Sequence, residues 1–267
     1  MRSRRPALAL LFALASTPLT AGCAAEVDEV ESSEEGLTRV TEAERAAAQA
    51  TPIDGFAYDR LTPTSARMMR AARWWMGAQD ESPRYPKPRM CATNVSKVLF
   101  LSGITSFDQE GVRAMLADVA AGGARVHKLP MAHADFVAAL NTIDGGHIPA
   151  GTLVAGMNIH TSRPGDQHIG MIGHTDPDGT VWIYHNNWYR PENEAGLRKD
   201  HMISDENLRR GFPRQWMATP WLRVTRDASG KITRATSLLP ALDDMDPFNG
   251  NYRITMAVLP QVARELR

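Results

Sequence analysis

The chain has little cysteine, no long hydrophobic run and no excess charge of either sign. Two cysteines among 267 residues are too few for the disulfide scaffold of a small secreted domain. No apolar run approaches the roughly 20 residues that a membrane-spanning helix needs. Thirty basic residues balance thirty acidic ones, so no large basic surface is available and we expect no nucleic-acid partner.

What remains is the composition of a folded globule. Hydrophobic residues make up 43% of the chain and charged residues 22%, which is enough apolar material for a substantial core. The length suits one large domain or two small ones. We find no internal repeat, and we expect a monomer.

The N-terminal segment is typical of a secretory signal. Three arginines precede an apolar stretch over residues 7–15, and small residues then lead to Cys23. The last part, Leu19-Thr20-Ala21-Gly22-Cys23, resembles the lipobox of bacterial lipoproteins. That resemblance implies cleavage after residue 22, lipidation of Cys23 and membrane anchoring in the bacterial cell envelope. An ordinary signal peptide cleaved near Ala21 or Ala25 is the alternative.

An acidic segment follows the expected cleavage site. Residues 24–37 contain six acidic residues and no basic one, so this stretch repels itself and buries little apolar area. We therefore divide the chain into a signal peptide at 1–22, a lipid-anchored acidic tether at 23–50 and a folded domain at 51–267. If Cys23 is lipidated, Cys91 is the one thiol left in an exported protein, which is unusual.

The first half of the domain is predicted to be helical. Apolar residues recur at helical spacing, and caps or glycines mark the ends. A proline near its start supports the second helix, and Gly103 ends the third. The predicted helices cover residues 41–50, 62–76, 91–103, 107–121 and 134–142.

The second half is predicted to form antiparallel strands. Turn sequences at 176–179 and 227–230 each join two apolar stretches into a hairpin. Residues 189–215 are polar and rich in arginine, and are predicted to be an insertion with a short helix at 204–209. Helices followed by antiparallel strands describe an α+β domain. The predicted strands cover residues 151–158, 168–174, 181–187, 221–226, 232–237 and 252–259.

Cys91 opens its predicted helix, where free N–H groups and the helix dipole stabilise a thiolate. A nucleophilic thiol also needs a base, and the first hairpin supplies histidines. Pairing outward from the turn sets 175 opposite 180 and 168 opposite 187, which places four polar side chains on one face of the hairpin. They are His168, His174, His185 and Asn187. A register slip of one residue would exchange His185 and Asn187 for Tyr184 and Asn186.

This order of elements resembles the papain-like NlpC/P60 and CHAP superfamily of bacterial cell-wall cysteine peptidases and amidases. The resemblance covers residues 85–190 and is carried by three stretches: Met90-Cys91-Ala92-Thr93-Asn94, Pro149-Ala150-Gly151-Thr152-Leu153-Val154, and His168-Ile169-Gly170-Met171-Ile172 through Trp182-Ile183-Tyr184-His185-Asn186-Asn187. Met90, Ala92, Thr93 and Thr152 depart from the usual residues, so the chain resembles a divergent member. The resemblance implies a papain-like α+β fold with N-terminal helices packed on an antiparallel sheet.

The resemblance also implies site roles. Cys91 is the expected nucleophile, His168 the base that takes its proton, and Asn187 or His185 the group that orients His168. The Cys91 backbone N–H and the side chain of Tyr85 are the expected oxyanion donors. The implied substrate is an amide bond in peptidoglycan or another peptide, and no cofactor is required.

Other interpretations stay open. The domain is alternatively a catalytically silent papain-like module that binds cell wall or a partner protein, or an enzyme that transfers acyl groups or cleaves proteins. We predict no metal site, because the chain lacks H-E-x-x-H, H-x-H and a cysteine pair. His174 is expected to be solvated beside the turn. The remaining histidines are expected to be structural or at the surface: His127, His133, His147, His160 and His201.

Overall fold

A computed structural model describes residues 40–81, 91–104, 111–160, 167–188, 214–239 and 243–267, without the side chains of 79–81, 187–188 and 214–215. Several predictions from the sequence lie outside these residues: the signal peptide, lipidation of Cys23, the tether up to residue 39, Tyr85, the side chain of Asn187 and the insertion at 189–213. None of the helices in the described ranges has the length and apolarity needed to cross a membrane.

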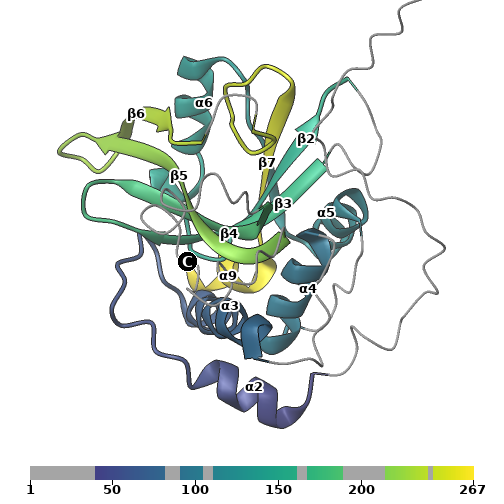
Figure 1. Ribbon diagram of the computed structural model, residues 1–267. Coiled ribbons are helices and arrows are strands. Elements are labelled where there is room, and N and C mark those ends of the chain that lie inside the picture. Colours follow the sequence, from purple (N-terminus) through teal and green to yellow (C-terminus); the bar gives the residue numbers. More distant parts are fainter. Residues whose placement is uncertain (1–39, 82–90, 105–110, 161–166, 189–213, 240–242) are drawn as a thin grey trace, which may run out of the picture.

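The described residues build one antiparallel sheet of seven strands, in the order β1-β7-β2-β3-β4-β5-β6. Figure 1 shows that the sheet is strongly curved, with β5 and β6 extending from one side. The strand bounds are Arg125–Lys128 for β1, Leu153–Asn158 for β2, Gln167–Thr175 for β3, Thr180–Trp188 for β4, Arg214–Arg226 for β5, Ile232–Ser237 for β6 and Tyr252–Val258 for β7.

Helices α3, α4 and α9 lie together on one side of the sheet, and α6 lies beside β6 (Figure 1). Their inner faces and the covered face of the sheet form the core, in which Trp75, Leu99 and Ile169 are fully buried. The predicted α+β class is confirmed. The helix bounds are Glu42–Gln49 for α2, Pro63–Glu81 for α3, Cys91–Leu101 for α4, Val112–Ala121 for α5, His133–Leu140 for α6 and Pro260–Glu265 for α9.

Local signals read from the sequence mark the ends of two helices. Thr62 caps α3, since its hydroxyl oxygen accepts the backbone N–H of Ser65 at 3.1 Å. Cys91 is the first residue of α4, and Gly103 ends that helix with φ +82°. The turn closes when the N–H of Ile104 donates to the carbonyl of Leu99 at 2.9 Å, an arrangement that favours glycine at the left-handed position.

Other boundaries differ from the prediction. The helix expected to start at residue 107 starts at Val112, because Gly111 is extended with φ −112° and ψ 136°. Strand β5 begins at Arg214 and not at the predicted residue 221. Pro220 argues against a continuous strand, but a bulge beside Trp182 accommodates it: Val181 pairs with Leu222, and Trp182 pairs with Pro220. Strand β1 and helix α9 were not predicted.

Helix α2 falls within the range predicted to be tether, yet it packs on the folded domain. Its capping box is complete, since Thr41 and Glu44 each bond the other's backbone N–H. Ala48 is fully buried, and the Gln49 amide donates to the carbonyls of Arg67 and Leu101 at 3.2 and 3.1 Å. The folded part therefore begins before residue 51, because α2 covers part of α3 and α4.

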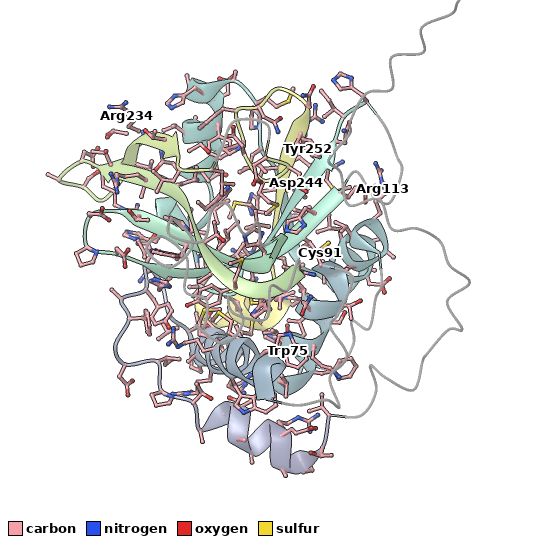
Figure 2. The ribbon with its side chains drawn as sticks, viewed as in Figure 1. Trp75, Cys91, Arg113, Arg234, Asp244 and Tyr252 are labelled. Carbon is pink, nitrogen blue, oxygen red and sulfur yellow. The ribbon has the colours of Figure 1, made fainter. Side chains whose placement is uncertain are left out.

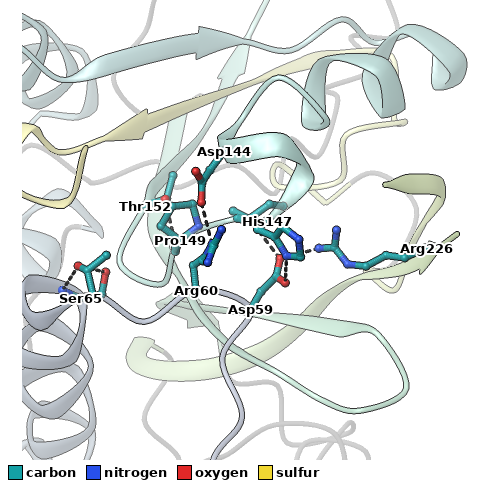
Figure 3. A network of polar contacts seen from close by, with 10 residues as sticks. Asp59, Arg60, Ser65, Asp144, His147, Pro149, Thr152 and Arg226 are labelled. Carbon is teal, nitrogen blue, oxygen red and sulfur yellow. Dashed lines mark hydrogen bonds and ion pairs between the residues drawn. The ribbon is translucent and has the colours of Figure 1, made fainter. Parts of the chain in front are cut away.

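A polar network fixes the segment before α3 to the sheet (Figure 3). The carboxylate of Asp59 forms hydrogen bonds with Nδ1 of His147 at 2.9 Å and with the backbone N–H of Ile148 at 2.8 Å. It also accepts a hydrogen bond from the guanidinium group of Arg226. Arg60 next to it pairs with Asp144 at 3.0 Å. His147 thus has a specific structural partner 88 residues away, which spacing along the chain does not reveal.

Candidate active site

Cys91 lies at the start of α4, and contacts of residues further along the helix hold this end of α4 in place. The Trp75 indole N–H of α3 donates to the side-chain oxygen of Asn94 at 2.8 Å, and Val95 and Leu99 are fully buried. Cys91 itself is half-buried and packs against the core. Figure 2 shows it at the end of α4 that lies toward β3. The helix packs on β3 and β4, the two strands that carry His168 and His185.

His168 and His185 are in direct contact. Nε2 of His168 lies 2.8 Å from Nδ1 of His185, and the ring planes are nearly perpendicular at 80°. The register explains this contact: Gly170 pairs with His185, so His185 and His168 share one face as diagonal neighbours. Gly170 leaves the space that His185 occupies, because a Cβ there would meet the Cβ of His185 at 2.6 Å. The one-residue slip is therefore excluded.

Thr219 continues the row across a third strand. Nε2 of His185 lies 2.9 Å from Oγ1 of Thr219, and both residues are buried. For His185 to accept the Nε2–H of His168, its Nδ1 must be the bare nitrogen and its Nε2 must carry the proton, which it then donates to Thr219. The hydroxyl of Thr219 can accept this proton and is therefore compatible with the tautomer of His185 that supports His168.

Two carboxyl groups lie on the other side of the His168 ring. Oδ2 of Asp244 is 3.9 Å from Nδ1 of His168, and the Asp244 side chain is 30% exposed. Asp243 is more enclosed. Burial and the negative charge of Asp244 raise the pKa of Asp243 to about 7, while His168 acts in the opposite direction. Asp243 therefore loses its proton near neutral pH.

The loop that carries these carboxyl groups is fixed against β2. Gly156 pairs with His168 across the sheet, and a Cβ on Gly156 would come within 1.8 Å of the carbonyl oxygen of Asp244. The Trp221 indole N–H donates to the carbonyl of Met245 at 2.9 Å. Only a glycine at this position lets the loop come so close to His168.

The prediction for His174 is wrong. His174 is 3% exposed, stacks on Trp182 at 4.8 Å between ring centroids, and lies 3.0 Å from the hydroxyl of Tyr184. A bulge between Ile172 and Thr175 shifts the register, so Thr175 pairs with Val181 and not with residue 180. This extra residue turns His174 to the face opposite His168. Burial lowers the pKa of His174 to about 4.

The other predicted site residues have no described side chains. Asn187 pairs with Gln215 through its backbone, and its side chain, Tyr85 and Cys23 lie outside the described part. Among the described residues, no group of three or more His, Cys, Asp and Glu side chains is arranged to hold a metal ion.

Thr219, Asp243 and Asp244 were missed from the sequence. Thr219 fell outside the predicted strand because of Pro220. The acidic pair had a visible signal, since Asp243, Asp244 and Asp246 stand within four residues before the last predicted strand. Nothing in the sequence placed that cluster beside His168, however, because 76 positions separate Asp244 from it.

The chain was also compared with known proteins. No protein-family model, no curated protein and no solved structure matches it.

Proposed function

We propose that this chain is an exported, lipid-anchored cysteine hydrolase with a papain-like fold, which cleaves amide bonds in peptidoglycan peptides. The observation that carries the proposal is the 2.8 Å contact between His168 and His185 on strands packed against the helix that begins with Cys91. A half-buried thiol at a helix N-terminus and an imidazole oriented by a third polar group are the two parts that cysteine hydrolysis needs.

In the proposed mechanism, each step uses a defined nitrogen of His168. Because Nε2 of His168 is engaged by His185, Nδ1 is the nitrogen that takes the proton from the Cys91 thiol. The thiolate attacks the carbonyl carbon and forms a tetrahedral intermediate, and the Cys91 backbone N–H donates to its oxyanion. His168 then returns the proton from Nδ1 to the leaving amine, and the C–N bond breaks.

Water completes the cycle. The acyl group is now a thioester on Cys91, and His168 takes a proton from the attacking water molecule as the thioester breaks. The acid product leaves and the thiol is restored. Throughout, His185 accepts the Nε2–H of His168, and its own Nε2–H stays on Thr219. The positive charge that forms on His168 is thus stabilised by the acceptor nitrogen of His185, whose position is fixed by the sheet.

The substrate follows from the expected location. A protein exported on a signal peptide and held by an N-terminal lipid meets cell-wall peptides at high local concentration. The resemblance to cell-wall peptidases and amidases supports the same substrate class. Free peptides, proteins and acyl acceptors other than water are the competing substrates.

Purified full-length protein incubated with peptidoglycan, with soluble products identified by mass spectrometry, tests the proposal. We expect released peptides from the parent and none from Cys91→Ala. The cut bond is given by the new termini. Binding to peptidoglycan without release, by parent and variant alike, would support the silent binding module and contradict the proposal.

The nucleophile can be tested without a substrate. Iodoacetamide reacts with thiolates, so an activated Cys91 should be alkylated near neutral pH faster than free cysteine. Mass spectrometry of the modified peptide identifies the site. His168→Ala is expected to slow the alkylation of Cys91. Equal rates for Cys91 and free cysteine would remove the main support for the proposed function.

A further inference from the structure

We infer that Asp244 is a positioning residue of the proposed reaction: its carboxylate, 3.9 Å from Nδ1 of His168, stabilises the protonated form of that imidazole, and the neighbouring carboxyl group of Asp243 adds to this effect. The inference rests on the proposed function for its role in catalysis. The charge coupling on which it depends is a property of the fold and is measurable separately.

The geometry places His168 between two partners. His185 holds Nε2 at 2.8 Å, and the carboxylate of Asp244 lies 3.9 Å from Nδ1. At that distance the carboxylate does not hydrogen-bond Nδ1 but still acts on the imidazolium by charge. His168 is 4% exposed, so water screens this interaction less than it would at the surface.

The loop is rigid enough to keep that distance. The carbonyl of Asp243 accepts the side-chain amide of Asn249 at 2.6 Å, and the carboxyl of Asp243 accepts the N–H of Met245 at 2.8 Å. The backbone carbonyl of Asp244 also lies against Gly156 of β2, which holds the loop close to the sheet. These contacts limit the movement of the loop, so little reorganisation is needed when His168 gains its proton.

Two neighbouring charged groups act on Asp243. The carboxylate of Asp244 raises its pKa, and His168 lowers it. Within the described ranges, no lysine or arginine forms an ion pair with either carboxyl group. The printed contacts of this loop with neighbouring strands are those of Gly156 of β2, which lies against the carbonyl of Asp244, and of the neutral indole of Trp221 of β5, which donates to the carbonyl of Met245.

The pair therefore links the imidazole to pH. Burial and the negative charge of Asp244 raise the pKa of Asp243 to about 7, so Asp243 loses its proton near neutral pH. The negative charge that Asp243 then carries stabilises the His168 imidazolium as the pH rises.

The titration of His168, followed by NMR of the ring nitrogens in the full chain, tests this directly. We expect Asp244→Asn to lower the midpoint of His168 by about one pH unit, and Asp244→Glu to restore most of the shift. Asp246→Asn is the matched control, because it removes the same charge from the same loop at a side chain bonded to the N–H of Phe248. An unchanged midpoint in folded Asp244→Asn would overturn the inference.

A second variant covers the case in which Asp244→Asn does not fold. Asp243→Asn keeps an acceptor for the N–H of Met245 and removes only the second charge, so it should lower the His168 midpoint. A midpoint equal to that of the parent would again overturn the inference. Alkylation of Cys91 by iodoacetamide reports on the proposed function independently: a shifted His168 beside an unreactive thiol would leave the coupling intact and contradict the hydrolase.

Discussion

Nε2 of His168 lies 2.8 Å from Nδ1 of His185. In the proposed mechanism these two imidazoles have different tasks: His168 exchanges protons with the reactants, and His185 orients His168. Removing the acceptor tests this division. We expect His185→Leu to lower the rate of Cys91-dependent peptide release on the order of 100-fold, because His168 loses the partner that fixes its ring.

His185→Gln is the matched comparison, since its amide oxygen offers an acceptor at similar reach. It should retain more activity than His185→Leu, with both variants shown to be folded by circular dichroism. Full activity in a folded leucine variant would show that His185 has no orienting role.

Thr219 is predicted to matter through one hydrogen bond. Thr219→Val keeps the shape of the side chain but leaves the buried Nε2–H of His185 without its acceptor, a loss of about 1–3 kcal/mol in the free energy of unfolding. Urea denaturation measures it, and Thr219→Ser should recover most of the loss. A valine variant as stable as the parent would mean that this hydrogen bond does not contribute to the stability of the fold.

Gly156 is predicted to tolerate no side chain. Gly156→Ala places a Cβ against the carbonyl of Asp244, so the loop must move away from His168. We expect a loss of about 1–3 kcal/mol of stability together with loss of activity. Gly77→Ala is the control, because nothing lies within 4 Å of its added Cβ in α3. Alanine there should stabilise the helix by up to about 1 kcal/mol.

Buried His174 makes the fold sensitive to acid. Its folded pKa of about 4 lies below the ordinary value of 6.5, so the unfolded chain binds the proton more readily. The stability is complete above pH 6.5 and falls as the pH drops toward 4. Between pH 7.5 and 5 this one group should cost about 2 kcal/mol.

Urea unfolding at the two pH values measures the loss. His174→Gln should show a smaller difference between pH 7.5 and 5 than the parent does. His160→Gln, which removes an exposed imidazole, should behave as the parent. An equal pH dependence in His174→Gln would contradict the assignment to His174.

The sequence was informative wherever a signal is local. Turn residues located both hairpins, and Gly103 located the end of α4. The register near His168 was also predictable, because a short turn sets the pairing of both strands. The α+β class followed from the order of these elements.

Long-range and irregular features could not be predicted. A bulge leaves no fixed pattern in one sequence, so His174 was assigned to the wrong face. Because proline is unusual inside a strand, Pro220 gave no reason to predict the first half of β5, which includes Thr219. Asp244 reaches His168 only because β2, β3 and β7 assemble from separate parts of the chain, and no pattern along the sequence encodes that meeting.

The bulge in β3 has a further effect on how this hairpin tolerates changes in length. His168 and His174 are six positions apart, an even number that would put both rings on one side of a regular strand. Deleting Gly173 would remove the extra residue and leave the two histidines five positions apart, an odd number that keeps the imidazole of His174 on the side of Trp182 and Tyr184. The hairpin is therefore expected to keep the side-chain orientation of both histidines when this one residue is lost.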